Sequence, residues 1–577
     1  MNRKVLTIIT LMIMLSTVLF GTGQVSVASA DKQNEAVSPA SAHVNAAPPV
    51  AGQMNPNFTP YFGKSYEQPE QVKELYPEPD IDFDTPGFKA GKWNFTSQEE
   101  MMAFLEELDR TSDVMKMKTA GHSLEGRELP LLIFSTSSDK NTDDFKRKTT
   151  IMLEGQIHGN EPAGGESMLV MAQKLAKGDL GENVLEDINV LIVPRINLDG
   201  SYYFQRQTAN RLDANRDHVK LELPEVRTLH KIFNQFKPEV VISAHEYGTV
   251  PGKFPDVGEQ GALPYHDILL APGYNLNIPK TIRNKSTNWF VEPAHKDIEE
   301  KGFSSAPYYI VDRSQEKTTI AEGGLEARLD TNAYGLQPSF TILVESRGIG
   351  IGRENFERRV TAMVAAHTSL VKTTAKRATE IRAVVKAAKA KISRQGGKIG
   401  NNDKIVLDSQ RKELPGEQQL KVVDIAKGSI EKIPVNYYSS KEAEPTLERV
   451  RPTAYIMPPA YHEIAQKLET QGVIVKKLEK AKELTVEHYK VTDKEVDEQY
   501  YQGHLLNHVK TKIEEQKYLF PKGSYVFSSA QPAANLIALA LEPESSESYV
   551  TFNYLPVNVG DIVPVYRYME EEKLVKE

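Results

Sequence analysis

The chain has 577 residues, of which 40% are hydrophobic, and this length predicts two or more domains because a single core rarely grows so large. The formal net charge is −8 at pH 7, which disfavours nucleic acid or an anionic membrane surface as the main partner. The sequence contains no cysteine, so disulfides and cysteine catalysis are excluded.

The first thirty residues have the layout of a secretory signal peptide. "MNRK" is followed by the apolar run "VLTIITLMIMLSTVLF" and then by small residues that end in "ASA" at Ala30. We predict cleavage after Ala30 and a secreted, extracellular protein without stable membrane insertion. The alternative is a membrane anchor, for which the apolar run is short.

Residues 31–90 are rich in Pro, Ala, Ser and Asn and lack apolar periodicity, a composition that predicts a flexible N-terminal segment. From about residue 91, short apolar runs alternate with amphipathic stretches, as in strands joined by helices. The predicted strands are 149–155, 188–197, 238–245 and 339–346, and the predicted helices are 162–178 and 224–236. We therefore predict an α/β domain over residues 91–395, with a mixed, mostly parallel sheet flanked by helices.

Residues 355–392 show helical spacing of apolar residues without Pro or Gly, and this pattern predicts one long or broken helix that closes the domain. His367 lies inside the pattern, where we expect a packing or surface histidine. The loop "RQGGKIGNND" (394–403) then marks a domain boundary. Residues 400–577 include a strand–helix–strand pattern over 454–478, which predicts a smaller α/β or α+β accessory domain.

The stretch "EGQIHGNEPAGGE" (154–166) places His158 and Glu161 at the carboxyl end of a predicted strand, where open α/β sheets carry their ligand sites. His245 ends another predicted strand. Two imidazoles and one carboxylate are the ligand set of a catalytic zinc ion with a fourth position open for water. Calcium and magnesium fit less well because they prefer oxygen ligands. Chance or a hydrogen-bonded histidine is the alternative for an isolated His-x-x-Glu pair.

Six motifs follow one another over roughly residues 95–385: "GHSLEGRELPLLIFS", "EGQIHGNE", "VPRINLDG", "RLDANRD", "SAHEYG" and "SFTILVES". Together they resemble the zinc metallocarboxypeptidases of the carboxypeptidase A (funnelin-like) family, in particular large secreted bacterial members with an extra C-terminal domain. The resemblance implies that His158, Glu161 and His245 bind one zinc ion. It also implies that Glu345 is the general base toward zinc-activated water.

The same resemblance implies that Asn215 and Arg216 hold the terminal carboxylate of the substrate, a task that suits the planar guanidinium group. Arg206 is the predicted residue that polarises the scissile carbonyl, and Arg211 is the competing candidate.

Two positions leave roles open. Ser243 stands two residues before His245, where the family usually has an aspartate that orients the imidazole, so that role must fall to another group. The mobile tyrosine of the family is unassigned, and Tyr308 and Tyr309 are the candidates if their loop folds back.

Side-chain preference is a further open point. Asp330 lies 15 residues before Glu345, near the family position that sets this preference, and an acid there favours substrates that end in Lys or Arg. Arg328, two residues away, would instead favour an acidic group.

The predicted function is that of a secreted zinc-dependent metallocarboxypeptidase, a peptide hydrolase that releases C-terminal amino acids from peptides with a free carboxylate. One alternative is a cell-wall peptide amidase or carboxypeptidase, which needs the same metal and the same carboxylate contact. Another is a non-catalytic binding protein on the same fold. No organic cofactor is indicated.

Overall fold

The structure is a computed structural model that describes residues 63–81, 83–137, 141–181, 184–312, 317–400, 403–572 and 574–575. These residues all belong to a compact unit that spans Ala47–Glu577. The predicted signal peptide lies outside the described residues, as does the predicted flexible segment up to residue 62. Within the described part of the chain, none of the helices combines the length and the apolar content that crossing a membrane requires.

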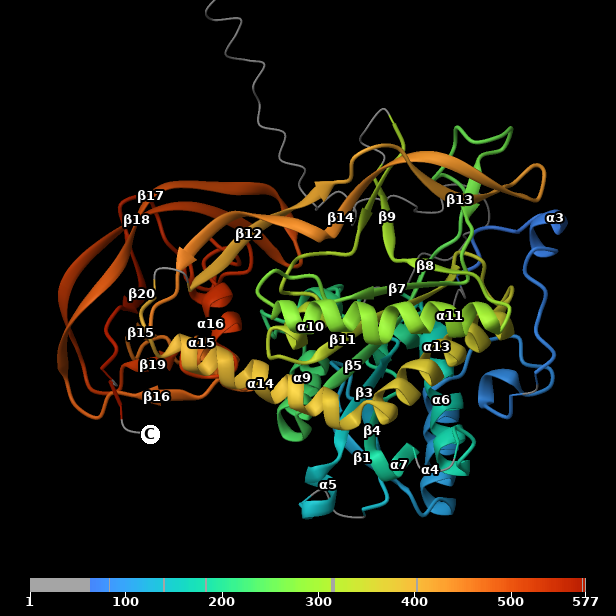
Figure 1. The fold of residues 1–577 in the computed structure, drawn as a ribbon, viewed down its shortest axis with the longest axis horizontal. Helices are drawn as coiled ribbons and strands as arrows, with labels where there is room; N and C mark the ends of the chain where they lie inside the picture. The colour runs from blue at the N-terminus through green and yellow to red at the C-terminus, as the bar shows by residue number, and fades with distance from the viewer. Residues whose placement is uncertain are drawn as a thin grey trace, which may run out of the picture. The chain divides into compact units, whose positions relative to one another are not determined.

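An eight-stranded mixed sheet is built from strands that precede residue 350, in the order β1-β2-β4-β3-β5-β11-β7-β8 (Figure 1). Its strands are β1 (Met115–His122), β2 (Glu128–Phe134), β3 (Thr149–Gly155), β4 (Ile188–Val193), β5 (Val240–Gly248), β7 (Ile268–Pro272), β8 (Ser305–Pro307) and β11 (Phe340–Ile349). The pairs β3–β4, β3–β5, β5–β11 and β7–β8 are parallel. The pairs β1–β2, β2–β4 and β7–β11 are antiparallel, so the predicted α/β fold with a mixed sheet is confirmed.

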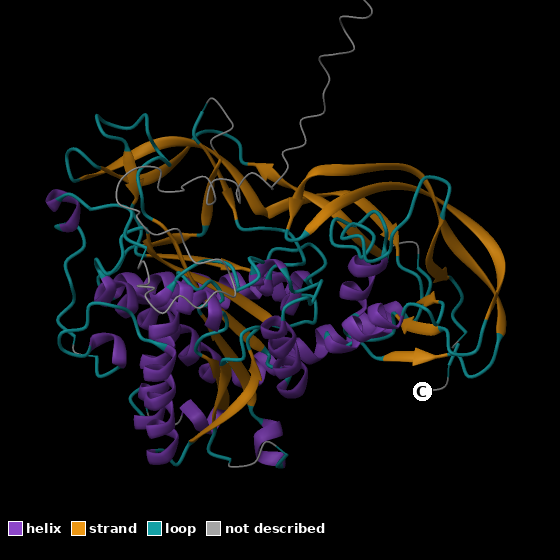
Figure 2. Ribbon diagram, turned by 180° about the vertical axis from the view of Figure 1, so that it is seen from behind, coloured by secondary structure: helices purple, strands orange, loops and turns teal. Residues whose placement is uncertain are grey.

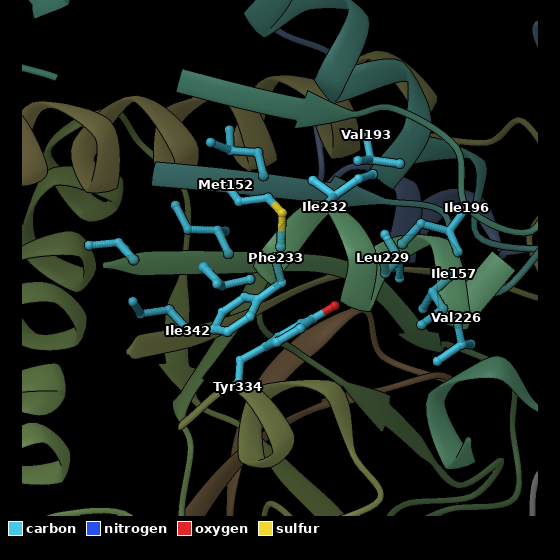
Figure 3. Packing of buried hydrophobic residues seen from close by; sticks show 14 of the residues in the cluster. Met152, Ile157, Val193, Ile196, Val226, Leu229, Ile232, Phe233, Tyr334 and Ile342 are labelled. Atoms are coloured by element: carbon cyan, nitrogen blue, oxygen red, sulfur yellow. The ribbon is translucent and has the colours of Figure 1, made fainter. Parts of the chain in front are cut away.

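The central strands are buried along their whole length, which explains why they read as continuous apolar runs. Every residue of β3 and β4 is buried, as is every residue of β5 before its last. Helices α6 and α13 pack against β3, β5 and β11, and helix α12 packs against β5 and β11. Figure 3 shows part of this core, in which the Tyr334 ring of α12 stacks on Phe233 of α9 with centroids 4.7 Å apart.

The described part of the chain contains helices before and after residue 400. They are α3 (Glu70–Lys73), η1 (Pro86–Phe88), α4 (Gln98–Thr111), α5 (Asp143–Arg147), α6 (Pro162–Lys177), α7 (Val184–Asp187), α8 (Leu198–Tyr203), η2 (Ala214–Arg216), α9 (Pro224–Phe236), α10 (Lys280–Lys285), η3 (Ser286–Val291), α11 (Glu292–Glu300), α12 (Asp330–Gly335), α13 (Phe356–Lys376), α14 (Ala378–Gly396), α15 (His462–Thr470) and α16 (Ala534–Leu541). The helix predicted over 355–392 is thus broken at residue 377. His367 is fully buried within α13.

Two six-stranded sheets involve the C-terminal segment, and the sequence analysis did not predict their longest strands. One has the order β6-β13-β14-β10-β9 with β12 also paired to β14, and the other has the order β16-β19-β15-β20-β17-β18. Their strands are β6 (Ala262–Pro264), β9 (Tyr309–Asp312), β10 (Thr319–Glu322), β12 (Lys404–Glu413), β13 (Gln418–Asp424), β14 (Ser429–Val450), β15 (Ala454–Met457), β16 (Val475–Lys477), β17 (Lys482–Tyr501), β18 (His504–Phe520), β19 (Tyr525–Ser528) and β20 (Ile562–Tyr568). Figure 2 shows the long strands in orange.

The predicted boundary near 395–403 falls between α14 and β12. However, β6 and β10, which precede it, pair with β13 and β14, which follow it. The division into domains at this point stays a prediction.

Residues 63–81 and 83–90 do not fit the predicted flexible segment, because several of their side chains are anchored. Val72 and Tyr76 are buried, and the Tyr76 hydroxyl donates to the Tyr265 carbonyl at 2.7 Å. Thr85 donates to the buried Glu166 carboxylate at 2.5 Å. The partners of Tyr76 and Thr85 lie 189 and 81 residues away in the sequence, so no local pattern in the segment reveals these contacts.

Candidate metal centre and active site

The three predicted metal ligands come from two adjacent parallel strands. His158 lies in the turn after β3, Glu161 directly precedes α6, and His245 lies in β5. The turn passes close to α8, since an added Cβ at Gly159 would lie 1.9 Å from the Gly200 backbone. Only glycine fits at position 159, and this close approach fixes the path of the chain between the two ligands.

The ligand atoms of His158, Glu161 and His245 converge within 4.8 Å of one another, and all three residues are buried. His158 Nδ1 lies 2.8 Å from one Glu161 oxygen, and His245 Nδ1 lies 3.1 Å from the other. The two Nδ1 atoms are themselves 3.1 Å apart. The structure therefore brings the predicted ligand set together.

The outward nitrogen of each imidazole faces an oxygen that can accept its proton. His158 Nε2 lies 3.1 Å from Asp213 Oδ1. His245 Nε2 lies 3.0 Å from the Ser243 hydroxyl, which donates to Asp330, and 3.6 Å from Asp330 Oδ2. An imidazole that binds a metal through Nδ1 carries its hydrogen on Nε2, so these contacts fix the required tautomer and ring orientation.

The charges around the ligands favour a cation. Burial acts to lower the pKa of His245, but the carboxylates of Glu161 and Asp330 outweigh it and raise this pKa to about 10. Burial also opposes ionisation of Glu161, yet the imidazoles of His158 and His245 hold its pKa well below the usual range. A divalent cation between the ligands would be stabilised by the same negative charges. Two imidazole nitrogens and one carboxylate fit zinc.

Glu345 lies on β11 beside these ligands, as the register pairs it with His245 on β5. Its side chain is buried, and burial raises the pKa of Glu345 to about 7 against the opposing effect of His245. A carboxyl group that titrates near neutral pH can both accept and return a proton.

Arg206, and not Arg211, lies beside the ligands. Its Nε and Nη2 atoms contact Asp213 Oδ2 at 3.0 and 2.8 Å, and its Nη1 lies 3.5 Å from Glu161. Arg211 is exposed, and its backbone has a φ of 65° in a turn where its N–H donates to the Thr208 carbonyl.

Asn215 and Arg216 lie in η2, directly after Asp213. Asp213 Oδ1 accepts from the Asn215 N–H at 2.8 Å, and Asn215 Nδ2 lies 3.3 Å from His245 Nε2. Arg216 is half-buried and donates to the Asn215 carbonyl at 3.0 Å. The sequence analysis gave no role to Asp213, although it begins the "DANR" motif, and it contacts an imidazole, a guanidinium and the η2 backbone.

Of the candidate tyrosines, Tyr308 is the one near the site. Burial raises the pKa of Tyr308, as does the charge of Glu345, whereas Arg216 lowers it, so Tyr308 lies close enough to feel the charges of these groups. Tyr309 packs instead in a separate apolar cluster with residues such as Val311.

Asp330 lies behind His245 and is 1% exposed, so it is one of the groups that contact the outward nitrogens of the proposed ligands. Its backbone N–H donates to Asn215 Oδ1 at 2.9 Å. Arg328 forms an ion pair with Glu547 at 2.8 Å.

Comparisons with known proteins identify the family. The sequence profile of the zinc carboxypeptidase family matches residues 101–222. Carboxypeptidase 2 of Trichophyton rubrum is 33% identical over 484 residues, which cover 83% of this chain and 88% of that protein. The chain belongs to the zinc carboxypeptidase family. Carboxypeptidase 2 of Trichophyton tonsurans is 32% identical over 486 residues, covering 83% of this chain and 88% of its own length. A metallo-carboxypeptidase structure from Burkholderia cenocepacia is 20% identical with a TM-score of 0.35, covering 48% of this chain and 69% of that one.

The protein is therefore a metallocarboxypeptidase, and its family implies zinc as the metal and peptides as substrates. The profile match includes His158 and Glu161, whereas His245 and Glu345 lie beyond it. A match over 83% of the chain is longer than residues 91–395, so the similarity to Carboxypeptidase 2 extends beyond the predicted catalytic domain.

Proposed function

We propose that this metallocarboxypeptidase is exported and releases the C-terminal residue of peptides at one zinc ion held by His158, Glu161 and His245. The observation that carries the proposal is the convergence of two Nδ1 atoms and a carboxylate, with Glu345 aligned beside His245 on the next strand. Export is supported by the signal-peptide pattern of residues 1–30.

Glu345 is the proposed proton carrier. Zinc in this site would polarise the scissile carbonyl and lower the pKa of water to about 7. Glu345 accepts a proton as the water oxygen adds to the carbonyl carbon, and it then donates that proton to the amide nitrogen as the C–N bond breaks. The products are the shortened peptide and a free amino acid.

Arg206 is the proposed stabiliser of the negative charge that develops on the carbonyl oxygen. Its two contacts with Asp213 hold the guanidinium at the edge of the ligand cluster before substrate arrives. A cation that needs no reorganisation stabilises a developing charge better than a mobile one does.

Asn215 and Arg216 are proposed to hold the terminal carboxylate of the peptide, through charge-assisted hydrogen bonds of the kind that guanidinium groups form in pairs. Tyr308, whose pKa responds to the charges of Glu345 and Arg216, is proposed as the mobile tyrosine. We assign Asp330 to orienting His245 and not to selecting the substrate side chain.

A pair of peptides that differ only at the C-terminus tests this proposal. Amidation of the carboxylate removes a contact worth about 2–4 kcal/mol, so kcat/KM should fall by about 30- to 1,000-fold. Arg216→Ala should lose a similar factor on the free acid and little on the amide, because the amide makes no such contact. Arg211→Ala is the matched control and should behave as the unmutated enzyme. Equal cleavage of acid and amide would refute the assigned carboxylate contact.

A further inference from the structure

The connection between β17 and β18 lies against the active-site loop. These strands run beside each other over their whole length (Figure 1), and only Gln502 and Gly503 join them. Both residues have positive φ, 49° and 83°, as expected for a tight two-residue hairpin turn. The turn therefore holds the Gln502 side chain in a defined direction.

Gln502 contacts the residue that orients His158. Its Oε1 accepts a hydrogen bond from the Asp213 N–H at 2.7 Å, across 289 residues of sequence. The turn also packs on the residue before, since an added Cβ at Gly503 would lie 3.4 Å from Leu212 Cδ2. The other end of Asp213, its carboxylate, lies 3.1 Å from His158 Nε2. Gln502 is therefore linked to the proposed metal ligand His158 through one intermediate residue, Asp213.

Tyr501 contacts the segment that leads to the residue behind His245. Arg328 Nε donates to the Tyr501 hydroxyl at 3.1 Å, and the guanidinium lies 5.0 Å from the centre of the ring. Glu547 accepts from the Arg328 backbone N–H at 3.1 Å and pairs with its side chain. Arg328 stands two residues before Asp330, whose carboxylate accepts from Ser243.

The loop around Asp213 needs such support because it has little regular structure. Between α8, which ends at Tyr203, and α9, which begins at Pro224, the one described helix is the three-residue η2. Asp213 is buried, and a buried backbone N–H that has no acceptor destabilises the conformation that contains it. The hairpin supplies that acceptor.

We propose that the β17–β18 turn is a positioning element of the metal centre. Gln502 fixes Asp213 toward His158, and Tyr501 fixes the segment that carries Asp330 toward His245. The C-terminal segment then completes the active site. This inference rests on the proposed role of the two histidines as zinc ligands.

Gln502→Gly is the sharpest test, because glycine adopts the same positive φ without strain and removes the side chain that carries the acceptor. Loss of an orienting partner lowers metal affinity by about 10- to 100-fold. Since Gln502 acts through Asp213, we expect the zinc Kd to rise by about 5- to 20-fold and kcat/KM to fall by a similar factor. The thermal midpoint should change by no more than it does in Tyr500→Ser, the matched control at a neighbouring position that is 77% exposed.

Three further variants distinguish loss of the hydrogen bond from a folding defect. Gln502→Asn tolerates positive φ and keeps an amide, but its shorter side chain falls short of Asp213, so it should behave as Gln502→Gly. Gln502→Glu restores an acceptor oxygen and should bring the zinc Kd back to within about threefold of the unmutated value. Tyr501→Phe, which keeps the ring and loses the acceptor, should raise the zinc Kd by a smaller factor.

The zinc Kd, measured by chelator competition on the full chain, distinguishes a failure of the proposed zinc site from a failure of the positioning role of the turn. If the unmutated protein fails to bind zinc, the proposed function is refuted. If it binds zinc and Gln502→Gly, Gln502→Asn and Tyr501→Phe all match Tyr500→Ser in Kd and kcat/KM, the positioning role of the turn is refuted while the zinc chemistry stands.

Discussion

Replacing Asp330 by Asn separates an orienting role from a substrate-selecting role. The carboxylate is 1% exposed, accepts from Ser243 and lies 3.6 Å from His245 Nε2. Asn keeps the size of the side chain and removes its charge. The Ser243 hydroxyl then loses a charge-assisted acceptor, and the proton on His245 Nε2 is less firmly held.

A hydrogen bond to a charged group contributes about 1.5–3 kcal/mol, and each 1.4 kcal/mol is tenfold in an equilibrium constant. Asp330→Asn should therefore raise the zinc Kd by about 10- to 150-fold. The assay is zinc binding by chelator competition, together with kcat/KM at saturating zinc for peptides that end in Lys or in Leu. Asp256→Asn, the same chemical change at an exposed site, is the control.

The ratio of the two kcat/KM values should stay within about threefold, because a carboxylate behind His245 does not reach the substrate side chain. An unchanged zinc Kd with a large loss of preference for Lys would refute this reasoning and would return Asp330 to the substrate pocket.

Four other outcomes are expected. Chelation should abolish hydrolysis and zinc should restore it, with lower zinc content in His158→Ala; full activity in metal-free protein would contradict a zinc mechanism. Glu345→Gln should bind zinc normally while kcat falls by at least ~10²-fold, and survival of turnover would require another base. Arg206→Ala should lower kcat by about 10²- to 10³-fold and Arg211→Ala by less than twofold, so similar losses in both would remove the distinction drawn between them. Burial lowers the pKa of His367 to about 3 from 6.5, and neither ring nitrogen has a hydrogen-bond partner among the described residues. The unfolded chain therefore binds this proton more tightly, and stability is lost as pH falls from about 6.5 toward 3, by up to about 1.4 kcal/mol per pH unit. Urea unfolding at several pH values should show a shallower loss in His367→Leu, and equal slopes would contradict this account.

The sequence predicted the strands and the meeting of the three proposed ligands because both depend on local pattern. A parallel strand buried on both faces reads as a run of apolar residues, and polar residues that end such runs meet at one edge of the sheet. His158, Glu161 and His245 could be proposed as ligands on that basis, and Glu345 could be proposed as the base by resemblance to the family.

The supports of the ligands could not be found in this way, because they depend on packing between distant segments. Asp330 reaches His245 only through the folded positions of α12 and β5, and its distance from Glu345 in sequence suggested another role. Gln502 follows the half of β17 that is mostly exposed, so this part of the strand shows no sustained apolar alternation. Partly solvated long strands carry the weakest sequence signal in this protein.

The sheet that joins β10 to β14 sets an order in which the protein can be completed during synthesis. Thr319 of β10 pairs with Asn436 of β14, roughly 120 residues further along the chain. At ribosomal rates of about 5–20 residues per second, the first strand waits about 6–24 s for its partner to emerge. During that interval β10 can pair with β9 alone and keeps one edge unprotected. Slow codons between the two strands would lengthen the interval between the synthesis of β10 and that of β14. A chaperone that covers exposed strand edges would be most useful during this interval.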